Sequence, residues 1–307
     1  MLRPYNIVRR DALLPDAQYL PALTYLQTLF LGFVQGLTEF LPVSSTAHMR
    51  IIPALLHWPD PGAPFSAIVQ LGPIVAIIAY FRRELIRYVA GIGRSLQQRI
   101  LFPPGDTDAR LGWFTVLGTV PLIVFGLALE KKVDNEYRNL YFVAAALIVL
   151  AVVLLIAESR SRRTLTLENL SFRDAMIIGL AQALAIVPGA SRSGCTITAG
   201  LFVGLDREDA ARFSFLLSIP AITLAGLYKL AKALHQTAHG AQLGAVAGSY
   251  LFGALIAGVV AYVVIKLFLG YLENERHTTM PFIIYRMLLG VALLVLVSIG
   301  FVVPESH

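Results

Sequence analysis

Residues 39–48 are Glu39-Phe40-Leu41-Pro42-Val43-Ser44-Ser45-Thr46-Ala47-His48, a polar string inside an apolar segment that covers about 24–56. A second string, Pro188-Gly189-Ala190-Ser191-Arg192-Ser193-Gly194-Cys195-Thr196, interrupts the apolar segment 175–205. Ionisable groups at membrane depth are costly and usually mark a functional path or site. Broken helices are tolerated there only where protein or a wet cavity surrounds the freed backbone groups. We therefore expect both segments to be re-entrant helix–loop–helix hairpins.

The composition of the 307-residue chain sets its class. It is 57% hydrophobic and 14% charged, with a mean hydropathy of +0.70, so its apolar residues exceed what a soluble domain could hide. The net charge of +6 comes mostly from loop arginines. No basic stripe interleaved with aromatic residues lies outside the apolar segments, so nucleic acid is not an expected partner. The single cysteine excludes an internal disulfide. We predict an all-α polytopic membrane protein.

Six further apolar segments have about the ~20 residues that a membrane span requires. They are 65–81, 111–129, 140–157, 213–231, 246–269 and 281–303. Arginines are concentrated in the connections 82–110 and 158–173, which the positive-inside rule places in the cytoplasm. The predicted fold is thus six transmembrane helices plus two re-entrant hairpins.

A weak internal repeat relates the two halves of the chain. Gln35-Gly-Leu is followed by Pro42-Val-Ser-Ser, and Gln182-Ala-Leu is followed by Pro188-Gly-Ala-Ser. With six spans, one hairpin enters from each side of the membrane. We expect one membrane domain, residues 1–307, made of an inverted-topology repeat over about 24–157 and 171–303, with the functional site at the two broken segments.

The first hairpin carries side chains suited to a metal ion and to nucleophilic attack. Gln35 and Glu39 are four residues apart and share a helix face. A carboxylate beside an amide, next to phosphate oxygens, suits a hard divalent ion such as Mg²⁺. Ser45 and His48 are three residues apart, which predicts a nucleophile and its base.

The second hairpin adds features that favour an anion. Ser191 or Ser193 can cap a helix that runs through Thr196, just as Ser44 or its neighbours can cap a helix after Pro42. Each helix N-terminus favours a bound anion, and Arg192 supplies a planar fork of donors suited to phosphate. Together these features predict a phosphate-binding site.

Structural alternatives remain open for each group. Ser44, Ser193 and Thr196 could merely kink a helix or bond a backbone carbonyl. Glu39 and Arg192 could form a buried ion pair that holds the hairpins together. His48 could be a polar packing residue.

The strings Gln35-Gly-Leu-Thr-Glu39-Phe-Leu-Pro-Val-Ser-Ser-Thr-Ala-His48 and Pro188-Gly-Ala-Ser-Arg192-Ser-Gly-Cys-Thr196 resemble the two signature motifs of the bacterial undecaprenyl-diphosphatase (bacitracin-resistance) family. The resemblance covers about residues 24–303. It implies an inner-membrane hydrolase that converts undecaprenyl diphosphate to the monophosphate carrier lipid for cell-wall synthesis, with a divalent cation, Mg²⁺ or Ca²⁺. Position 35 is glutamine where many members have glutamate, which leaves the metal site with one charge fewer.

The resemblance also implies roles for individual residues. Glu39 takes part in metal binding or catalysis, with Gln35 as a second metal ligand. Ser45 is the nucleophile, His48 its partner and Arg192 the diphosphate clamp. The residues expected to line the substrate pocket are Ser44, Thr46, Ser191, Ser193 and Thr196.

Two other functions fit the sequence less well. A transporter or flippase for a polyprenyl phosphate lipid would have the same inverted repeat, but it needs no nucleophile beside Glu39. An acid-phosphatase type of lipid phosphatase would need a second histidine after the Ser-Arg string, and the sequence there is Ser-Gly-Cys-Thr-Ile-Thr. The expected partners are the lipid substrate and the bilayer, and a homodimer is left open.

Overall fold

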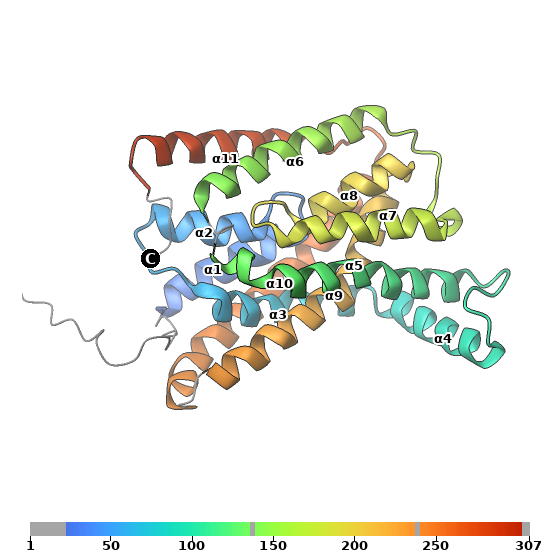
Figure 1. Cartoon of the computed structure of the whole chain (residues 1–307), viewed down its shortest axis with the longest axis horizontal. Coiled ribbons are helices and arrows are strands. Elements are labelled where there is room, and N and C mark those ends of the chain that lie inside the picture. The colour runs from blue at the N-terminus through green and yellow to red at the C-terminus, as the bar shows by residue number, and fades with distance from the viewer. Residues whose placement is uncertain (1–22, 136–138, 237–239, 303–307) are drawn as a thin grey trace, which may run out of the picture.

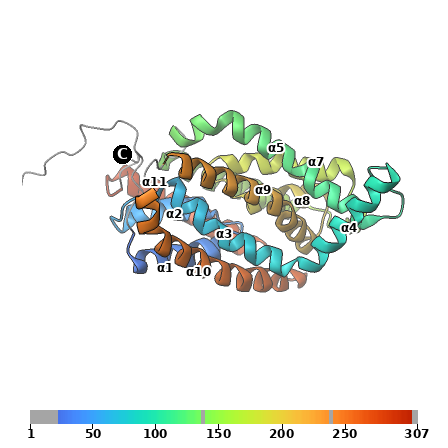
Figure 2. The same cartoon turned by 90° about the horizontal axis from the view of Figure 1, so that it is seen from below.

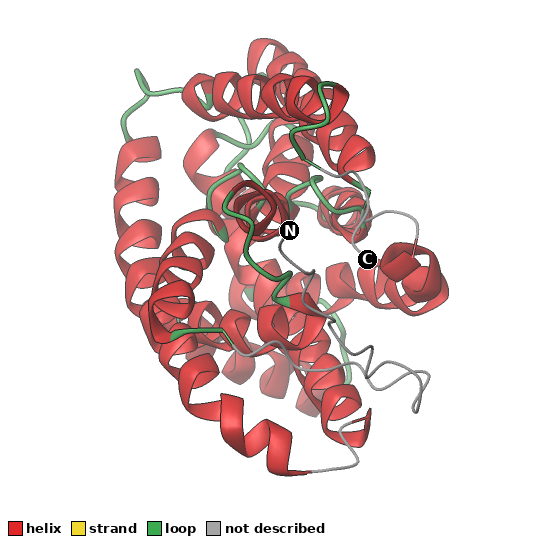
Figure 3. Cartoon of the chain, turned by 90° about the vertical axis from the view of Figure 1, so that its left-hand side faces the viewer, coloured by secondary structure: helices red, strands yellow, loops and turns green. Residues whose placement is uncertain are grey.

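The structure, a computed structural model, describes residues 23–135, 139–236 and 240–302. In these ranges the chain is helical, with one isolated bridge between Leu165 and Leu205 and no strand (Figure 3). The elements are α1 (Tyr25–Thr38), α2 (Ser45–Leu55), α3 (Gly62–Tyr80), α4 (Arg82–Gln98), α5 (Thr107–Asn135), α6 (Leu140–Arg160), η1 (Leu167–Asn169), α7 (Phe172–Gln182), η2 (Ala183–Ile186), α8 (Arg192–Val203), α9 (Arg207–Gln236), α10 (Gly240–Glu273) and α11 (Met280–Ser298). The predicted all-α class is confirmed for the described part of the chain.

Five of the described helices are long and apolar enough to cross a membrane. The candidate spans are Thr107–Leu129, Leu140–Arg160, Arg207–Tyr228, Ala247–Glu273 and Met280–Ser298, and each overlaps a predicted segment. The sixth predicted segment, 65–81, lies in α3, whose described apolar part, Ile68–Tyr80, is shorter. The chain is therefore a multi-pass membrane protein.

Each polar string forms a loop and the first turn of the helix that follows it, in the interior of the molecule. In Figure 1, α1 runs inward from the left-hand end and α2 returns toward it, while α7 and α8 do the same from the right-hand end. Pro42 and Pro188 lie in the loops, where no helical hydrogen bond requires their missing N–H group. As a result α2 and α8 both begin in the middle of the molecule and run to opposite ends.

The two halves of the chain exchange helices. Helix α1 packs on α10 from the second half, and α7 packs on α5 from the first (Figure 2). The backbones approach closely at both contacts. A Cβ on Gly36 would lie 2.4 Å from the Ala257 oxygen, and one on Gly179 would lie 2.3 Å from the Gly118 oxygen. Small residues at such contacts are typical of membrane helix packing.

The two arginine-rich connections lie at the same end of the molecule, as the positive-inside argument requires. A guanidinium nitrogen of Arg110, at the start of α5, donates to the Glu168 carbonyl. Helix α4 folds back along α5 and is fixed by two hydrogen bonds from Arg94 to Asp106, of 2.8 and 2.9 Å. The same guanidinium lowers the pKa of the Asp106 carboxyl.

Candidate active site

The two interior helices begin in the same way. Ser44 caps α2 by accepting from the Ala47 N–H at 3.3 Å, and Ser191 caps α8 by accepting from the Gly194 N–H at 3.1 Å. The two serines have φ of 72° and 68° and ψ of 93° and 109°, a conformation that L residues rarely adopt. Such strain persists only where the surroundings enforce it, and it is common at functional sites.

The two loops are bonded to each other. The Gly189 N–H donates to Thr46 Oγ1 at 3.3 Å, and the Ser193 hydroxyl donates to the Leu41 carbonyl at 2.9 Å. These bonds join segments about 150 residues apart in sequence. They place the N-termini of α2 and α8 side by side, so that the positive ends of two helix dipoles lie in one region.

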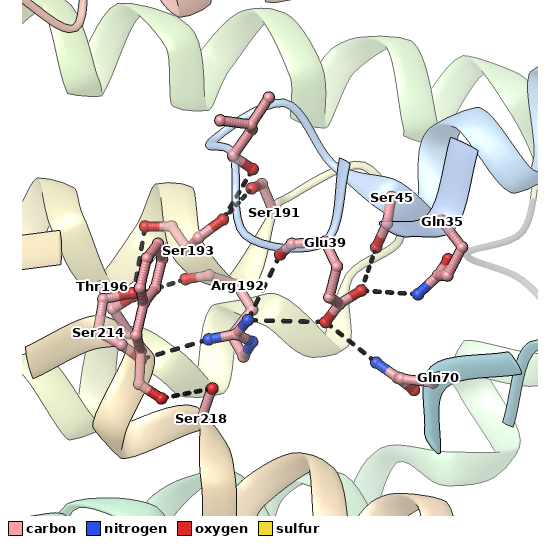
Figure 4. Close-up of polar contacts among 12 residues, drawn as sticks. Gln35, Glu39, Ser45, Gln70, Ser191, Arg192, Ser193, Thr196, Ser214 and Ser218 are labelled. Atoms are coloured by element: carbon pink, nitrogen blue, oxygen red, sulfur yellow. Dashed lines mark hydrogen bonds and ion pairs between the residues drawn. The ribbon is translucent and has the colours of Figure 1, made fainter. Parts of the chain in front are cut away.

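Glu39 is the centre of the polar contacts in this region (Figure 4). Its Oε2 accepts from Gln35 Nε2 at 2.8 Å and from the Ser45 hydroxyl at 2.7 Å. Its Oε1 accepts from Gln70 Nε2 at 3.2 Å and lies 3.6 Å from Arg192 Nη2. The side chain is only 4% exposed, so its charge is balanced by three hydrogen bonds and this ion pair and not by solvent.

Arg192 links the Glu39 hairpin to α9. Its Nη2 donates to the Glu39 carbonyl at 3.4 Å, its Nη1 donates to the Ser214 carbonyl at 3.3 Å, and its guanidinium lies 5.7 Å from the centre of the Phe40 ring. Its Nε is buried and has no partner among the described residues. Glu39 and Arg192 therefore form the buried ion pair that the sequence left open as an alternative. The Nε–H group of Arg192 makes no hydrogen bond within the described residues.

The pairing of Ser45 with His48 that the spacing predicts is not made. Helix α2 begins at Ser45, and the Ser45 hydroxyl donates back to Glu39. The His48 ring turns the other way, with Nδ1 2.7 Å from the Ser44 carbonyl and Nε2 2.6 Å from the Tyr285 hydroxyl. Because a carbonyl only accepts, a proton is on Nδ1, and Nε2 shares a hydrogen bond with the Tyr285 hydroxyl. Nothing in the sequence near His48 indicates Tyr285, which comes from α11.

The five residues expected to line a pocket have different surroundings. Thr46 is exposed, whereas Ser44, Ser191 and Ser193 are buried within the loop contacts described above. Thr196 is fully buried, with its hydroxyl 2.6 Å from that of Ser214. Thr46 is thus the most accessible of the five, and Thr196 supports the α8–α9 contact.

Four residues of this region were missed by the sequence analysis: Gln70, Ser214, Tyr285 and Arg286. Gln70 contacts Glu39, and Ser214 contacts Arg192 and Thr196. Two signals were available: Gln70 is an amide inside an apolar segment, and Arg286 is the sole charge in the predicted span 281–303. The argument that makes Arg192 a functional candidate, a charged side chain at membrane depth, applies equally to Arg286.

The residues around Glu39 fit a divalent cation in part. Among the described residues no three His, Cys, Asp or Glu side chains gather at one place. Mg²⁺ is nevertheless often held by one or two carboxylates together with substrate phosphates and water. Glu39 supplies one carboxylate, and the amide of Gln35, which here donates to Glu39 through its nitrogen, has an oxygen on the same group. This donor set fits a cation that is shared with a phosphate.

Comparison with known proteins identifies relatives over almost the whole chain. The sequence profile of the bacitracin resistance protein BacA family matches residues 28–292. A Myxococcus xanthus protein named undecaprenyl-diphosphatase is 47% identical over 284 residues, which cover 92% of this chain and 93% of that protein. A protein of the same name from Pelodictyon phaeoclathratiforme is 45% identical over 297 residues, 92% of this chain and all of the relative. One from Chloroherpeton thalassium is 46% identical over 90% of this chain. The resemblance noted in the two motifs is therefore confirmed, and the chain belongs to the bacitracin resistance protein BacA family.

Proposed function

We propose that this protein hydrolyses undecaprenyl diphosphate to undecaprenyl phosphate and inorganic phosphate in the bacterial inner membrane, and so recycles the cell-wall carrier lipid. The observation that carries the proposal is the convergence of Ser45 and Arg192 on Glu39, beside the N-termini of α2 and α8. A diphosphate is strongly anionic, and preorganised donors stabilise the charge that develops during phosphoryl transfer. The names of the relatives support the choice of substrate.

Binding begins at Arg192 in this proposal. A phosphate oxygen replaces Glu39 Oε1 as the partner of Nη2 and engages the unpartnered Nε, so the guanidinium contacts phosphate through two parallel donors. The exchange keeps the buried cation paired. Uncapped N–H groups in the first turns of α2 and α8 can bond the remaining phosphate oxygens.

The chemical step is an attack by Ser45 on the terminal phosphorus. The Ser45 proton passes to Glu39 Oε2, which already accepts it at 2.7 Å, the new Oγ–P bond forms, and the bond from phosphorus to the bridging oxygen breaks. Undecaprenyl phosphate leaves. Water then attacks the phosphoserine, inorganic phosphate departs, and the proton on Glu39 passes to the Ser45 oxygen, which restores both side chains. The role of base, assigned to His48 from the sequence, thereby passes to Glu39. His48 holds the start of α2 through its bonds to the Ser44 carbonyl and Tyr285.

We also propose that Glu39 and the amide oxygen of Gln35 hold a divalent cation, Mg²⁺ or Ca²⁺, together with the diphosphate. The bound cation would offset negative charge on the phosphoryl oxygens. For Gln35 to serve, its amide must rotate so that oxygen replaces the nitrogen that now faces Glu39. The loss of one carboxylate relative to a glutamate at this position predicts weaker cation binding.

The proposed architecture is six transmembrane helices and two re-entrant hairpins in an inverted repeat, with α3 as the short sixth span. The exchange of helices between α1–α10 and α7–α5 supports it, and so do the matching backbone angles of Ser44 and Ser191. Under this alignment α1, α2, α3, α5 and α6 correspond to α7, α8, α9, α10 and α11. Helix α4 has no counterpart among the described residues of the second half.

Phosphate release from undecaprenyl diphosphate by the purified protein, with and without EDTA, tests the proposal. We expect release that EDTA stops and added Mg²⁺ or Ca²⁺ restores. The transporter alternative, which the same inverted repeat favours, predicts lipid movement across vesicles without any phosphate release. Release that is indifferent to EDTA would remove the cation from the proposal but leave hydrolysis in place.

A further inference from the structure

Arg286, in the middle of α11, is the largest side chain that is fully buried in the described part of the molecule, with 0% exposure. None of the described carboxylates lies within 4.0 Å of its guanidinium, in contrast to buried Arg192 and Arg207, which pair with Glu39 and Glu158. Burying a charge is expensive unless it is hydrogen-bonded and compensated. The position of this cation therefore requires a structural reason.

The guanidinium donates to five backbone carbonyls from three segments. Nη1 reaches Pro42 at 3.4 Å in the first loop, and Nη2 reaches Gly189 at 3.2 Å and Ala190 at 3.0 Å in the second. Two further bonds, of 3.3 and 3.4 Å, anchor it to the carbonyls of Ala146 and Leu147 in α6. One side chain thus holds both broken segments against the same helix.

The bonded carbonyls come just before the helix starts that form the site. Pro42 precedes the cap Ser44 by two residues, and Ala190 directly precedes the cap Ser191. Any shift of the guanidinium would shift the strained caps with it, and hence the first turns that carry Ser45 and Arg192. The packing is close, because a Cβ on Gly194 would lie 2.5 Å from Arg286 Nη1.

The charge of Arg286 has an electrostatic consequence. Glu39 neutralises Arg192 in this structure, whereas Arg286 has only carbonyl dipoles as partners. The region between the loops therefore keeps one net cationic charge beside two helix N-termini. Such a region attracts an anion without further rearrangement.

We propose that Arg286 is a positioning residue for the phosphate site: it fixes the two loops relative to each other, and its uncompensated charge favours an anionic phosphate between them. The kinetic part of this inference rests on the proposed function, and the anion-binding part does not.

Three variants separate the two contributions. Arg286→Lys keeps the charge but loses the planar set of donors, and Arg286→Gln keeps a donor but loses the charge. Gly194→Ala keeps the arginine but adds a Cβ 2.5 Å from its Nη1 and 3.1 Å from the Ser191 hydroxyl. Arg207→Lys is the matched control, because Arg207 is a buried arginine bonded to Glu158 and the Glu275 carbonyl, outside the loops. Each protein is purified in detergent and compared per folded enzyme, by kcat and KM for undecaprenyl diphosphate and by the Tm shift with inorganic pyrophosphate.

We expect Arg286→Lys to retain the pyrophosphate shift while kcat falls at least tenfold, and Arg286→Gln to lose both. Gly194→Ala should lower kcat at least threefold with the shift retained, and Arg207→Lys should lower Tm with kcat per folded enzyme unchanged. Should the Arg286 variants not fold, Gly194→Ala tests whether the packing of Arg286 against the start of α8 and its Ser191 cap sets kcat. Wild-type kcat and pyrophosphate shift in the folded variants would overturn the inference. A wild-type protein that releases no phosphate would instead refute the proposed function, and the pyrophosphate shifts would still test the charge of Arg286.

Discussion

At the scale of single residues, Glu39 and its neighbours decide what the site can do. A buried carboxylate with three hydrogen bonds and one ion pair is a stable arrangement, so the geometry at rest resembles a structural ion pair. What distinguishes it from one is the half-buried Ser45 hydroxyl and the unpartnered Arg192 Nε, which provide a nucleophile and a spare donor in the same place.

Replacement of Ser45 should affect turnover more than replacement of its neighbour Ser44. Ser45→Ala removes the nucleophile, and we expect kcat to fall by more than ~10²-fold, since positioned proton transfer alone contributes ~10²–10⁴-fold. Ser44→Gly is the matched control, because glycine tolerates the φ of 72° and replaces a capping serine at a cost of only a few tenths of a kcal/mol. Phosphate release at saturating substrate measures both. Residual turnover in Ser45→Ala within tenfold of wild type, or a larger loss at Ser44, would contradict the assignment.

Replacement of Arg192 by lysine tests whether the fork of donors matters beyond its charge. Lysine can still pair with Glu39, but a single ammonium cannot reproduce bidentate contact with phosphate. We expect kcat/KM to fall about 10- to 150-fold, which corresponds to the ~1.5–3 kcal/mol of one hydrogen bond to a charged group. Tm should change little. If Arg192→Lys turned over at close to the wild-type rate, Arg192 would be a structural counter-ion.

At the scale of elements, close helix contacts hold the loops in place. Helix α1 leads into the Glu39 loop and lies against α10, where Gly36 leaves no room for a side chain beside Ala257. The position of Glu39 therefore depends on backbone packing one turn away from it. The α7–α5 contact at Gly179 and Gly118 supports the second loop in the same way.

Gly36→Ala should destabilise the protein and displace the site. The added Cβ would lie 2.4 Å from the Ala257 oxygen, and overpacking of this kind typically costs about 1–3 kcal/mol. Gly126→Ala is the control, because nothing lies within 4 Å of a Cβ there and alanine favours helix. Thermal unfolding in detergent should show a lower Tm for Gly36→Ala and an unchanged or higher Tm for Gly126→Ala. Equal Tm values would show that the α1–α10 contact accommodates the added methyl group without loss of stability.

At the scale of the whole molecule, composition and broken segments were enough to predict the class, five of the spans and the two loops. Apolar length and the cost of buried charge are local properties, so 39–48 and 188–196 reveal themselves in sequence. Contacts between residues far apart in the sequence cannot be predicted from such local properties. His48 bonds Tyr285 and not Ser45, and Glu39 gains Gln70, because α11 and α3 are brought to the loops only by tertiary packing.

The most direct test of the central claim, that hydrolysis takes place at the Glu39 cluster, is phosphate release from undecaprenyl diphosphate by wild type and Glu39→Gln side by side. The substitution keeps the size of the side chain but removes both its charge and its ability to take the Ser45 proton. We expect wild type to release one phosphate per lipid and Glu39→Gln, folded and inserted in the membrane, to lose at least ~10²-fold in rate, in line with general-base contributions. Normal phosphate release by Glu39→Gln, with unchanged dependence on Mg²⁺ or Ca²⁺, would contradict the account.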